Sequence, residues 1–181
     1  ELGVKDSKKM TDEKILEVVP KFIQKIPYEC IILFNKEYNE KYADGYNMNK
    51  LKAILHNKAL MNLKNKYSDY DYIVVDQFAE KYVYFSYLKA SSNVVRDITF
   101  MTKAEDKNLA VACGSIISRY LFLKEFDKIC DEIHIPLPKG AGKDVDTIGE
   151  EVVEKYGKEK LQDIAKVNFK NTDRILHTMV Y

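Results

Sequence analysis

The sequence predicts an α/β fold on three observations. Two apolar runs of strand length, Tyr28–Phe34 and Tyr72–Asp76, are typical of strands that are covered on both faces of a sheet. Met48–Lys66 has helical periodicity and lies between them, so this order predicts a parallel pair joined by a right-handed crossover. In Thr102–Lys124 apolar residues recur at three- and four-residue steps, which predicts a central helix packed on that sheet.

The central helix has a predicted start and a predicted inner face. Thr102 and Glu105 have the Thr-x-x-Glu spacing of a capping box, in which each side chain binds a backbone N–H of the first turn. We therefore expect the helix to begin at Thr102 and to continue to about Asp131. The residues predicted to face the core are Leu109, Ala112, Cys113, Ile116, Tyr120 and Leu123.

The other segments before this helix follow in order. Thr11, with an acidic first turn after it, predicts the N-terminus of a helix whose apolar periodicity extends to Ile26. Residues 37–45 are polar and predict a turn. Residues 80–89 are rich in aromatic side chains and are compatible with a helix or with a strand. Residues 93–101 form an extended run that leads into the central helix.

The last part of the chain predicts a C-terminal helical extension. Residues 135–143 are punctuated by proline and glycine and are typical of a loop. Two short helices are expected at 145–156 and 158–166, and residues 167–181 are expected to be loosely attached. The length fits one domain, so we expect residues 1–181 to form a single domain.

Composition limits the classes of function. The chain has 29 lysines and arginines against 28 aspartates and glutamates, so any binding to nucleic acid or to a membrane depends on a local patch. It contains no apolar run of transmembrane length, and its first residues are not a signal peptide. These observations predict a cytoplasmic protein without membrane attachment.

Cysteine and histidine usage argues against a zinc site. The cysteines Cys30, Cys113 and Cys130 are far apart and lie among apolar residues, so we expect buried thiols in a reducing compartment. The three histidines share no ligand spacing with one another or with the cysteines. A bound metal is therefore expected to take oxygen ligands.

Two carboxylates are predicted at the same end of the sheet. Asp76 closes a buried strand, and Glu105 follows the next extended run. Convergent carboxylates there suit Mg²⁺ or Mn²⁺ in phosphoryl chemistry, because hard cations take carboxylate oxygens and bind phosphate on their open faces. Structural interpretations stay open, since an aspartate after a strand is commonly a turn residue and the capping box by itself explains Glu105.

Three further segments also have two interpretations. Lys5, Lys8 and Lys9 flank Asp6 and Ser7, a combination suited to a phosphate backbone, although a solvated loop explains it as well. Residues 139–143 lack P-loop spacing, which leaves a flexible basic loop that contacts a polyanion. The tyrosines of residues 82–87 could stack on bases or belong to the core.

Four motifs occur in a recognisable order. They are Val4–Ile15 with its Asp-Ser-Lys, Val74–Phe78, Thr102–Ala112 with Ser115–Tyr120, and Leu137–Gly142. Together they resemble the catalytic domain of bacterial ribonuclease HIII, from the first residue to about Thr172. The sequences Lys-Ala-Glu and Leu-Pro-Lys-Gly-Ala-Gly are similar to type HIII rather than to type HII.

The resemblance implies a ribonuclease H-like fold, with a mixed sheet flanked by helices. It also implies an endoribonuclease, a hydrolase that cleaves the RNA strand of RNA/DNA hybrids with two divalent metal ions, Mg²⁺ or Mn²⁺, held by four carboxylates. By that resemblance Asp76 is the third carboxylate and Glu105 the fourth, and Ser7, Lys8 and Lys103 contact the substrate. We expect a monomer.

The sequence departs from the family pattern at one place. The family's first two carboxylates, an adjacent Asp-Glu pair on the opening strand, precede the Asp-Ser-Lys motif and have no counterpart in residues 1–181. We therefore expect these residues to be the larger C-terminal part of a catalytic domain, with the opening strands and an N-terminal substrate-binding domain upstream. The alternative is a non-catalytic nucleic-acid-binding or assembly module that keeps the fold without a complete site.

Overall fold

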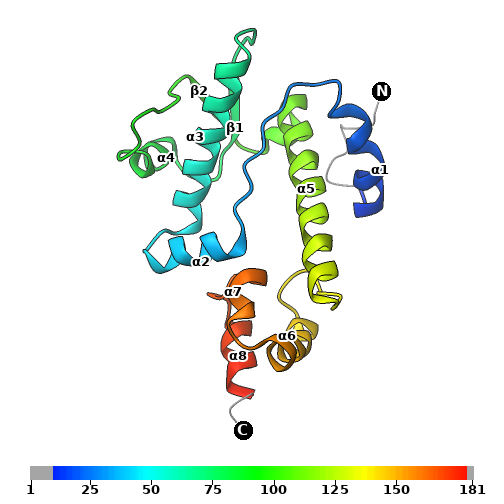
Figure 1. The fold of residues 1–181 in the computed structure, drawn as a ribbon. Helices are drawn as coiled ribbons and strands as arrows, with labels where there is room; N and C mark the ends of the chain where they lie inside the picture. Colours follow the sequence, from blue (N-terminus) through cyan, green and yellow to red (C-terminus); the bar gives the residue numbers. More distant parts are fainter. Residues whose placement is uncertain (1–9, 179–181) are drawn as a thin grey trace. The chain divides into compact units, whose positions relative to one another are not determined.

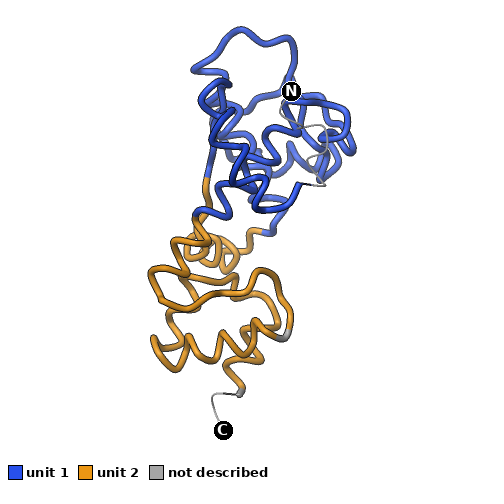
Figure 2. The backbone as a smooth tube through the Cα atoms, turned by 90° about the vertical axis from the view of Figure 1, so that its right-hand side faces the viewer, with its two compact units in different colours: residues 1–31, 47–124 blue, residues 32–46, 125–181 orange. Residues whose placement is uncertain are grey.

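A computed structural model describes residues 10–178 of the chain (Figure 1). The chain divides into two compact units, one made of residues 1–31 and 47–124 and the other of residues 32–46 and 125–181 (Figure 2). The long helix α5, Leu109–Ile133, contributes residues to both units.

The first unit contains a parallel pair of strands, β1 (Ile73–Asp76) and β2 (Ile98–Met101), in which Ile73 is paired with Ile98 and Asp76 with Met101. The predicted pairing of residues 28–34 with residues 72–76 is wrong, because in the described part of the chain β1 pairs with β2 and residues 28–34 are not a strand. The α/β class is confirmed, and the sheet that residues 10–178 form is this parallel pair alone.

Helix α3, Met48–Lys66, packs against the pair and has the predicted bounds. The side chain of Asn47 caps it by accepting a hydrogen bond of 2.9 Å from the amide of Lys50. Residues 80–89 form helix α4, Lys81–Tyr87, which resolves the choice between helix and strand. The shared core of these elements is formed by Ala53, Ile73, Val75, Tyr84, Leu88, Val95 and Ile98.

Residues 28–34, predicted as a strand buried on both faces, form an extended segment without strand pairing among the described residues. Its side chains alternate between exposed and half-buried, and Ile32 and Phe34 are 40% and 54% exposed. The half-buried Glu29 contacts α3, where Lys66 and Asn62 donate hydrogen bonds to its carboxylate. The prediction of a buried strand is wrong because only one side of the segment is covered by described residues.

Helix α1, Asp12–Phe22, lies against the first half of α5. Its predicted cap is confirmed, since the Thr11 side chain accepts a hydrogen bond from the amide of Lys14. Arg119 on α5 donates hydrogen bonds of 2.8 and 2.9 Å to the Asp12 carboxylate. The buried residues of this interface are Ile15, Val18, Val19, Phe22, Ala112, Ile116, Ile117 and Leu123.

The predicted start of the central helix is wrong. Helix α5 begins at Leu109, and the side chain of Asn108 accepts a hydrogen bond of 3.1 Å from the amide of Val111. A short 3₁₀ helix, η2 (Ala104–Asp106), precedes it and has no side-chain cap. Leu109 is 60% exposed and does not face the core, because it stands at the first position of the helix.

The second unit is helical. Its described elements are α2 (Asn35–Ala43), the end of α5, α6 (Lys143–Tyr156), α7 (Lys160–Ile164) and α8 (Lys170–Thr178). They share a core of Ile133, Ile135, Val152, Leu161 and Ile175. The predicted C-terminal helical extension is confirmed, but two local predictions are wrong. Most of the expected polar turn is α2, and the expected loose tail contains α8, whose Ile175 is buried.

Two buried asparagines connect the helices of the second unit. Asn39 on α2 donates to the carbonyls of Gln162 and Ala165 and accepts from the amide of Val167. Asn171 on α8 donates to carbonyls of the loop before α6 and to a carboxylate oxygen of Asp146. Buried amides that satisfy several backbone groups at once fix the loops that they contact.

The cysteines are free but are less buried than expected. Cys30 is exposed, and Cys113 and Cys130 are half-buried. Partial burial raises the pKa of the Cys113 thiol. The prediction of three buried thiols is therefore wrong, most clearly for Cys30 in the extended segment. None of the helices in the described part of the chain is long and apolar enough to cross a membrane.

Candidate active site

Asp76 stands at the carboxyl end of β1 with its side chain exposed. The ladder between the strands continues one residue further, because the amide of Gln77 donates a hydrogen bond of 3.0 Å to the carbonyl of Met101. The amide of Ala104 donates a second bond, of 2.7 Å, to Oδ1 of Asp76. The chain around Asp76 is thus held by the end of β2, and its carboxylate by the turn that follows β2.

Glu105 lies in the turn that holds Asp76. It follows Ala104 directly in η2, and Ala104 is fully buried, so the backbone of the turn is fixed against the end of β1. The Glu105 side chain is half-buried. The prediction that Asp76 and Glu105 occupy the same end of the sheet is confirmed by these contacts, whereas their roles are not tested by them.

Lys103 has an unusual backbone conformation. Its φ of 52° and ψ of 45° lie in the left-handed region, which few residues other than glycine and asparagine adopt without cost. Its exposed side chain stands between β2 and η2, next to the turn that binds Asp76. Lys107 closes the same turn by donating a hydrogen bond of 3.0 Å to the carbonyl of Thr102.

The other two predicted substrate contacts, Ser7 and Lys8, lie outside the described residues. Of the five predicted site residues, the structure therefore brings together Asp76, Lys103 and Glu105.

The chemistry of the donors fits a hard divalent cation. One oxygen of Asp76 accepts the Ala104 amide, and a carboxylate has further lone pairs with which to bind a metal. Within residues 10–178, no group of three or more His, Cys, Asp or Glu side chains is arranged to hold a metal ion. The described residues thus offer the two carboxylates of Asp76 and Glu105, and a complete site needs ligands in addition to them.

The structure places three side chains near Asp76 that the sequence did not single out. They are Lys52 and His56 on α3 and Phe78 just after β1. The order of the elements in the sequence could have indicated Lys52 and His56. A helix joined to a strand by a short connection runs antiparallel to it, which brings the first turns of the helix to the carboxyl end of the strand. The two interpretations of the tyrosines of residues 82–87 apply to different residues. Tyr84 is fully buried in the core, whereas Tyr82 is 76% exposed.

Comparison with known proteins first shows the family to which the chain belongs. A family model described as Ribonuclease HII matches residues 1–172, so the chain belongs to the ribonuclease HII family. Within this family of enzymes, its relatives carry a more particular name. A protein named Ribonuclease HIII from Bacillus cereus (strain ATCC 14579) is 41% identical, and the match covers 99% of this chain and 58% of that protein. A Ribonuclease HIII from Staphylococcus epidermidis is 43% identical over 99% of this chain and 59% of its own length.

Solved structures agree with this assignment. The crystal structure of Bst-RNase HIII in complex with Mn²⁺ matches with a TM-score of 0.94 at 35% identity, covering 98% of this chain and 58% of that one. The structure of Aquifex aeolicus RNase H3 matches with a TM-score of 0.69 at 26% identity, over 92% of this chain and 58% of that one. The predicted ribonuclease H-like fold and the resemblance to ribonuclease HIII are confirmed. The chain spans about three-fifths of the length of these relatives.

Proposed function

We propose that this chain is part of an endoribonuclease that cleaves the RNA strand of RNA/DNA hybrids by metal-assisted phosphodiester hydrolysis. The observation that carries the proposal is the corner where β1 ends, in which the turn that contains Glu105 binds the Asp76 carboxylate through the Ala104 amide. Its support from relatives is the family, in which the similar proteins from Bacillus cereus and Staphylococcus epidermidis are named Ribonuclease HIII.

In this proposal Asp76 and Glu105 hold divalent metal ions, Mg²⁺ or Mn²⁺. Bound metals of this kind activate a water and stabilise the charge that develops on the phosphate oxygens. Asp76 is suited to the role because its backbone is fixed by the β1–β2 ladder and its Oδ1 is fixed by Ala104, which limits the positions that the carboxylate can adopt. Lys103 is proposed to contact the substrate from the same turn, together with Ser7 and Lys8.

We further propose that residues 1–181 form the larger C-terminal part of the catalytic domain. The chain matches 58% of the Bacillus cereus relative. A site with two metals needs more carboxylates than Asp76 and Glu105. The resemblance to ribonuclease HIII assigns the missing pair to an Asp-Glu sequence upstream. We expect the complete protein to be a cytoplasmic monomer that acts on RNA/DNA hybrids.

One observation favours the alternative of a non-catalytic binding module. The described residues contain no group of three or more potential ligand side chains arranged for a metal. A protein with this fold and an incomplete site could bind a hybrid without cleaving it. In that case hybrid binding should be indifferent to a chelator.

The experiment that separates the two functions uses the complete gene product. It is incubated with RNA/DNA hybrid, double-stranded RNA and double-stranded DNA of one sequence, each labelled at one end, with Mg²⁺, with Mn²⁺ or with EDTA. The proposal expects cleavage of the RNA strand of the hybrid alone, with either metal and not with EDTA. Binding of the hybrid without cleavage, unchanged by EDTA, would establish the binding module instead.

A further inference from the structure

Two side chains on α3 face the end of β1 where Asp76 lies. Helix α3 is joined to β1 by residues 67–72, and Ala53 of the helix packs in one cluster with Ile73 and Val75 of the strand. The helix therefore runs antiparallel to the strand, which brings its first turns to the strand's carboxyl end. Lys52 and His56 are four residues apart in these turns and share one face of the helix.

The ring of Phe78 joins these side chains to the Asp76 corner. Phe78 comes two residues after Asp76. Its ring centroid lies 5.2 Å from that of His56, at an interplanar angle of 60°. The Nζ atom of Lys52 lies 5.5 Å from the same centroid. A lysine ammonium over an aromatic face is restrained without losing its charge, so Phe78 holds Lys52 at a defined place.

Lys52 supplies the positive charge in this group. Burial, reinforced by the charge of Lys52, lowers the pKa of His56, while Asp76 acts in the opposite direction. Lys52 and Asp76 therefore both lie close enough to His56 to influence its pKa. The Lys52 side chain is exposed, and in residues 10–178 it forms no ion pair with a carboxylate.

An exposed ammonium next to carboxylates that act in phosphoryl chemistry can bind a phosphate of the substrate. Carboxylates repel a polyanionic backbone, and a fixed cation next to them offsets that repulsion for one phosphate. A lysine suits this task because it acts as a point charge and needs no bidentate geometry. Two of the four other lysines of the same helix are less available, since Lys64 and Lys66 are paired with Asp97 and Glu29.

We propose that Lys52 is a substrate-positioning residue, which binds a backbone phosphate of the nucleic acid next to the scissile position while Phe78, packed against His56, restrains its ammonium. This inference rests on the proposed function, because the ligand is the hybrid that Asp76 and Glu105 are proposed to act on. It adds a helix α3 contact to a site otherwise built from β1 and the turn after β2.

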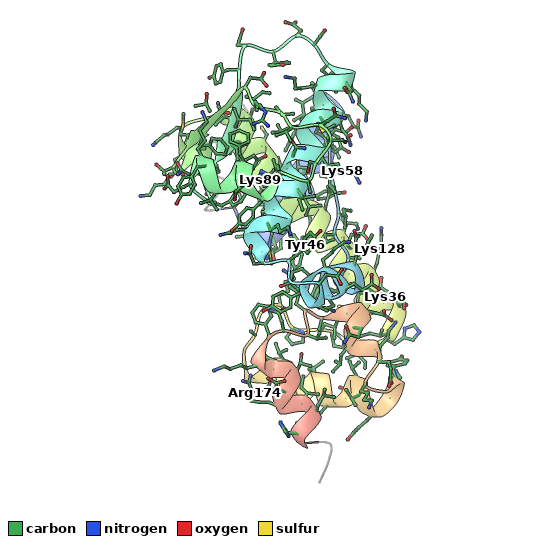
Figure 3. All side chains as sticks on the ribbon, turned by 90° about the vertical axis from the view of Figure 1, so that its left-hand side faces the viewer. Lys36, Tyr46, Lys58, Lys89, Lys128 and Arg174 are labelled. Carbon is green, nitrogen blue, oxygen red and sulfur yellow. The ribbon has the colours of Figure 1, made fainter. Side chains whose placement is uncertain are left out.

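The test compares Lys52→Gln with Lys58→Gln in the complete gene product. Lys58 lies on the same helix, is exposed, and is the matched control for the loss of one charge (Figure 3). For Lys52→Gln we expect KM for the hybrid to rise on the order of tenfold with kcat nearly unchanged. The slope of log(kcat/KM) against log salt should become less negative by about one. Lys58→Gln should match wild type in both, and Lys52→Arg should retain most of the slope.

Two results would overturn the proposal. One is a Lys52→Gln enzyme with the KM and salt slope of Lys58→Gln, and the other is a raised KM with an unchanged slope, which would make Lys52 structural. A wild-type protein that cleaves no hybrid contradicts the proposed function instead. In that case the same variants are compared by fluorescence anisotropy with a labelled hybrid in EDTA, where equal affinity and equal salt dependence of Lys52→Gln and wild type would likewise exclude the phosphate contact.

Discussion

The backbone amide of Ala104 donates a hydrogen bond of 2.7 Å to Oδ1 of Asp76. This bond joins the end of β1 to the turn that contains Glu105, so it couples the backbones of the two candidate ligands. Loss of the Asp76 carboxylate would leave the Ala104 amide without this acceptor. The bond therefore gives Asp76 a structural role that is separable by substitution from its proposed catalytic role.

Asp76→Asn should separate these two roles. The amide oxygen of asparagine can still accept the Ala104 hydrogen bond, so the variant should fold and melt within a few degrees of wild type. It loses the charge that a divalent cation requires, so cleavage of the hybrid with Mg²⁺ should fall to background. Single-turnover cleavage and thermal melting of the complete gene product measure the two effects.

Asp76→Ala provides the contrast. It removes the acceptor of the Ala104 amide and should lower the free energy of unfolding by about 1–3 kcal/mol, in addition to abolishing cleavage. If Asp76→Asn destabilises the protein as much as Asp76→Ala, or cleaves at a rate near wild type, the residue is a structural turn carboxylate and the proposed metal site is wrong.

Lys103 combines a strained backbone with a side chain proposed to contact substrate. Asparagine adopts the left-handed region more readily than lysine, so Lys103→Asn should be as stable as wild type or more stable by up to about 1 kcal/mol. The same change removes the ammonium and should raise KM for the hybrid. Denaturant unfolding and steady-state kinetics measure the two effects.

A β-branched residue at the same position tests the backbone alone. Lys103→Val should cost about 1–3 kcal/mol, because valine is disfavoured at positive φ. Equal stabilities of the asparagine and valine variants would show that the turn relaxes out of the left-handed conformation. An unchanged KM in Lys103→Asn would remove Lys103 from the substrate contacts.

Tyr84 carries a buried hydroxyl without a hydrogen-bond partner among the described residues. Burial raises the pKa of Tyr84 to about 12. Its ring contacts Phe78, Phe85 and Phe100 edge-on, so the ring contributes packing and the hydroxyl adds only a desolvation cost. Tyr84→Phe should therefore leave the free energy of unfolding unchanged or raise it by up to about 2 kcal/mol.

Equilibrium unfolding in urea checks this prediction. Tyr84→Ala, which also deletes the ring, is the control and should cost about 3–5 kcal/mol. A loss of more than about 1 kcal/mol in Tyr84→Phe would mean that the hydroxyl has a hydrogen-bond partner in solution.

Asp146 should contribute to the pH dependence of stability. Hydrogen bonds from Arg174, and from Asn171, lower the pKa of Asp146 from its usual value of 3.8. A carboxyl whose pKa is lower in the folded state stabilises the protein above its unfolded pKa, and this contribution is lost as the pH falls through the folded pKa. Asp146→Asn should therefore melt below wild type near neutral pH, and the difference should shrink below about pH 4. A difference that is constant with pH would contradict an ionic contribution.

The sequence predicted best those elements whose signals are local. Met48–Lys66 is helical over its predicted length because periodicity and the Asn47 cap agree. Asp76 ends β1 as expected, and Glu105 follows β2 closely enough to lie at the same end. In each case one segment of sequence contains the whole signal.

The predictions that were wrong depended on partners distant in sequence or on competing local patterns. The apolar run Tyr28–Phe34 has strand composition, but a strand needs a neighbour, and β1 pairs with β2 instead. The order of α3 and β1 placed the first turns of α3 at this end of the strand, but which of their side chains faces Asp76 depends on how α3 packs, so Lys52 was not singled out. The capping box of Thr102 and Glu105 predicted a helix start at Thr102, but the Asn108 side chain caps α5 and the helix begins at Leu109.

The Asn108 cap changes what substitutions of Glu105 can show. With helix α5 beginning at Leu109, the described cap is that of Asn108, and neither Glu105→Gln nor Glu105→Ala removes it. Asn108→Ala does remove it and should cost about 0.5–2 kcal/mol while leaving the candidate ligands in place. The three variants thus separate helix capping from metal binding.

If Glu105 is a metal ligand, both substitutions should lose most cleavage at millimolar Mg²⁺ because both remove the charge. Glu105→Gln keeps a carbonyl oxygen and should recover part of its activity with Mn²⁺, whereas Glu105→Ala should not. Asn108→Ala should cleave at a rate near wild type below its own melting temperature. If Glu105→Gln instead retains nearly full activity with Mg²⁺, the fourth ligand lies elsewhere, and Asp106, the next residue of the same turn, is the first position to substitute.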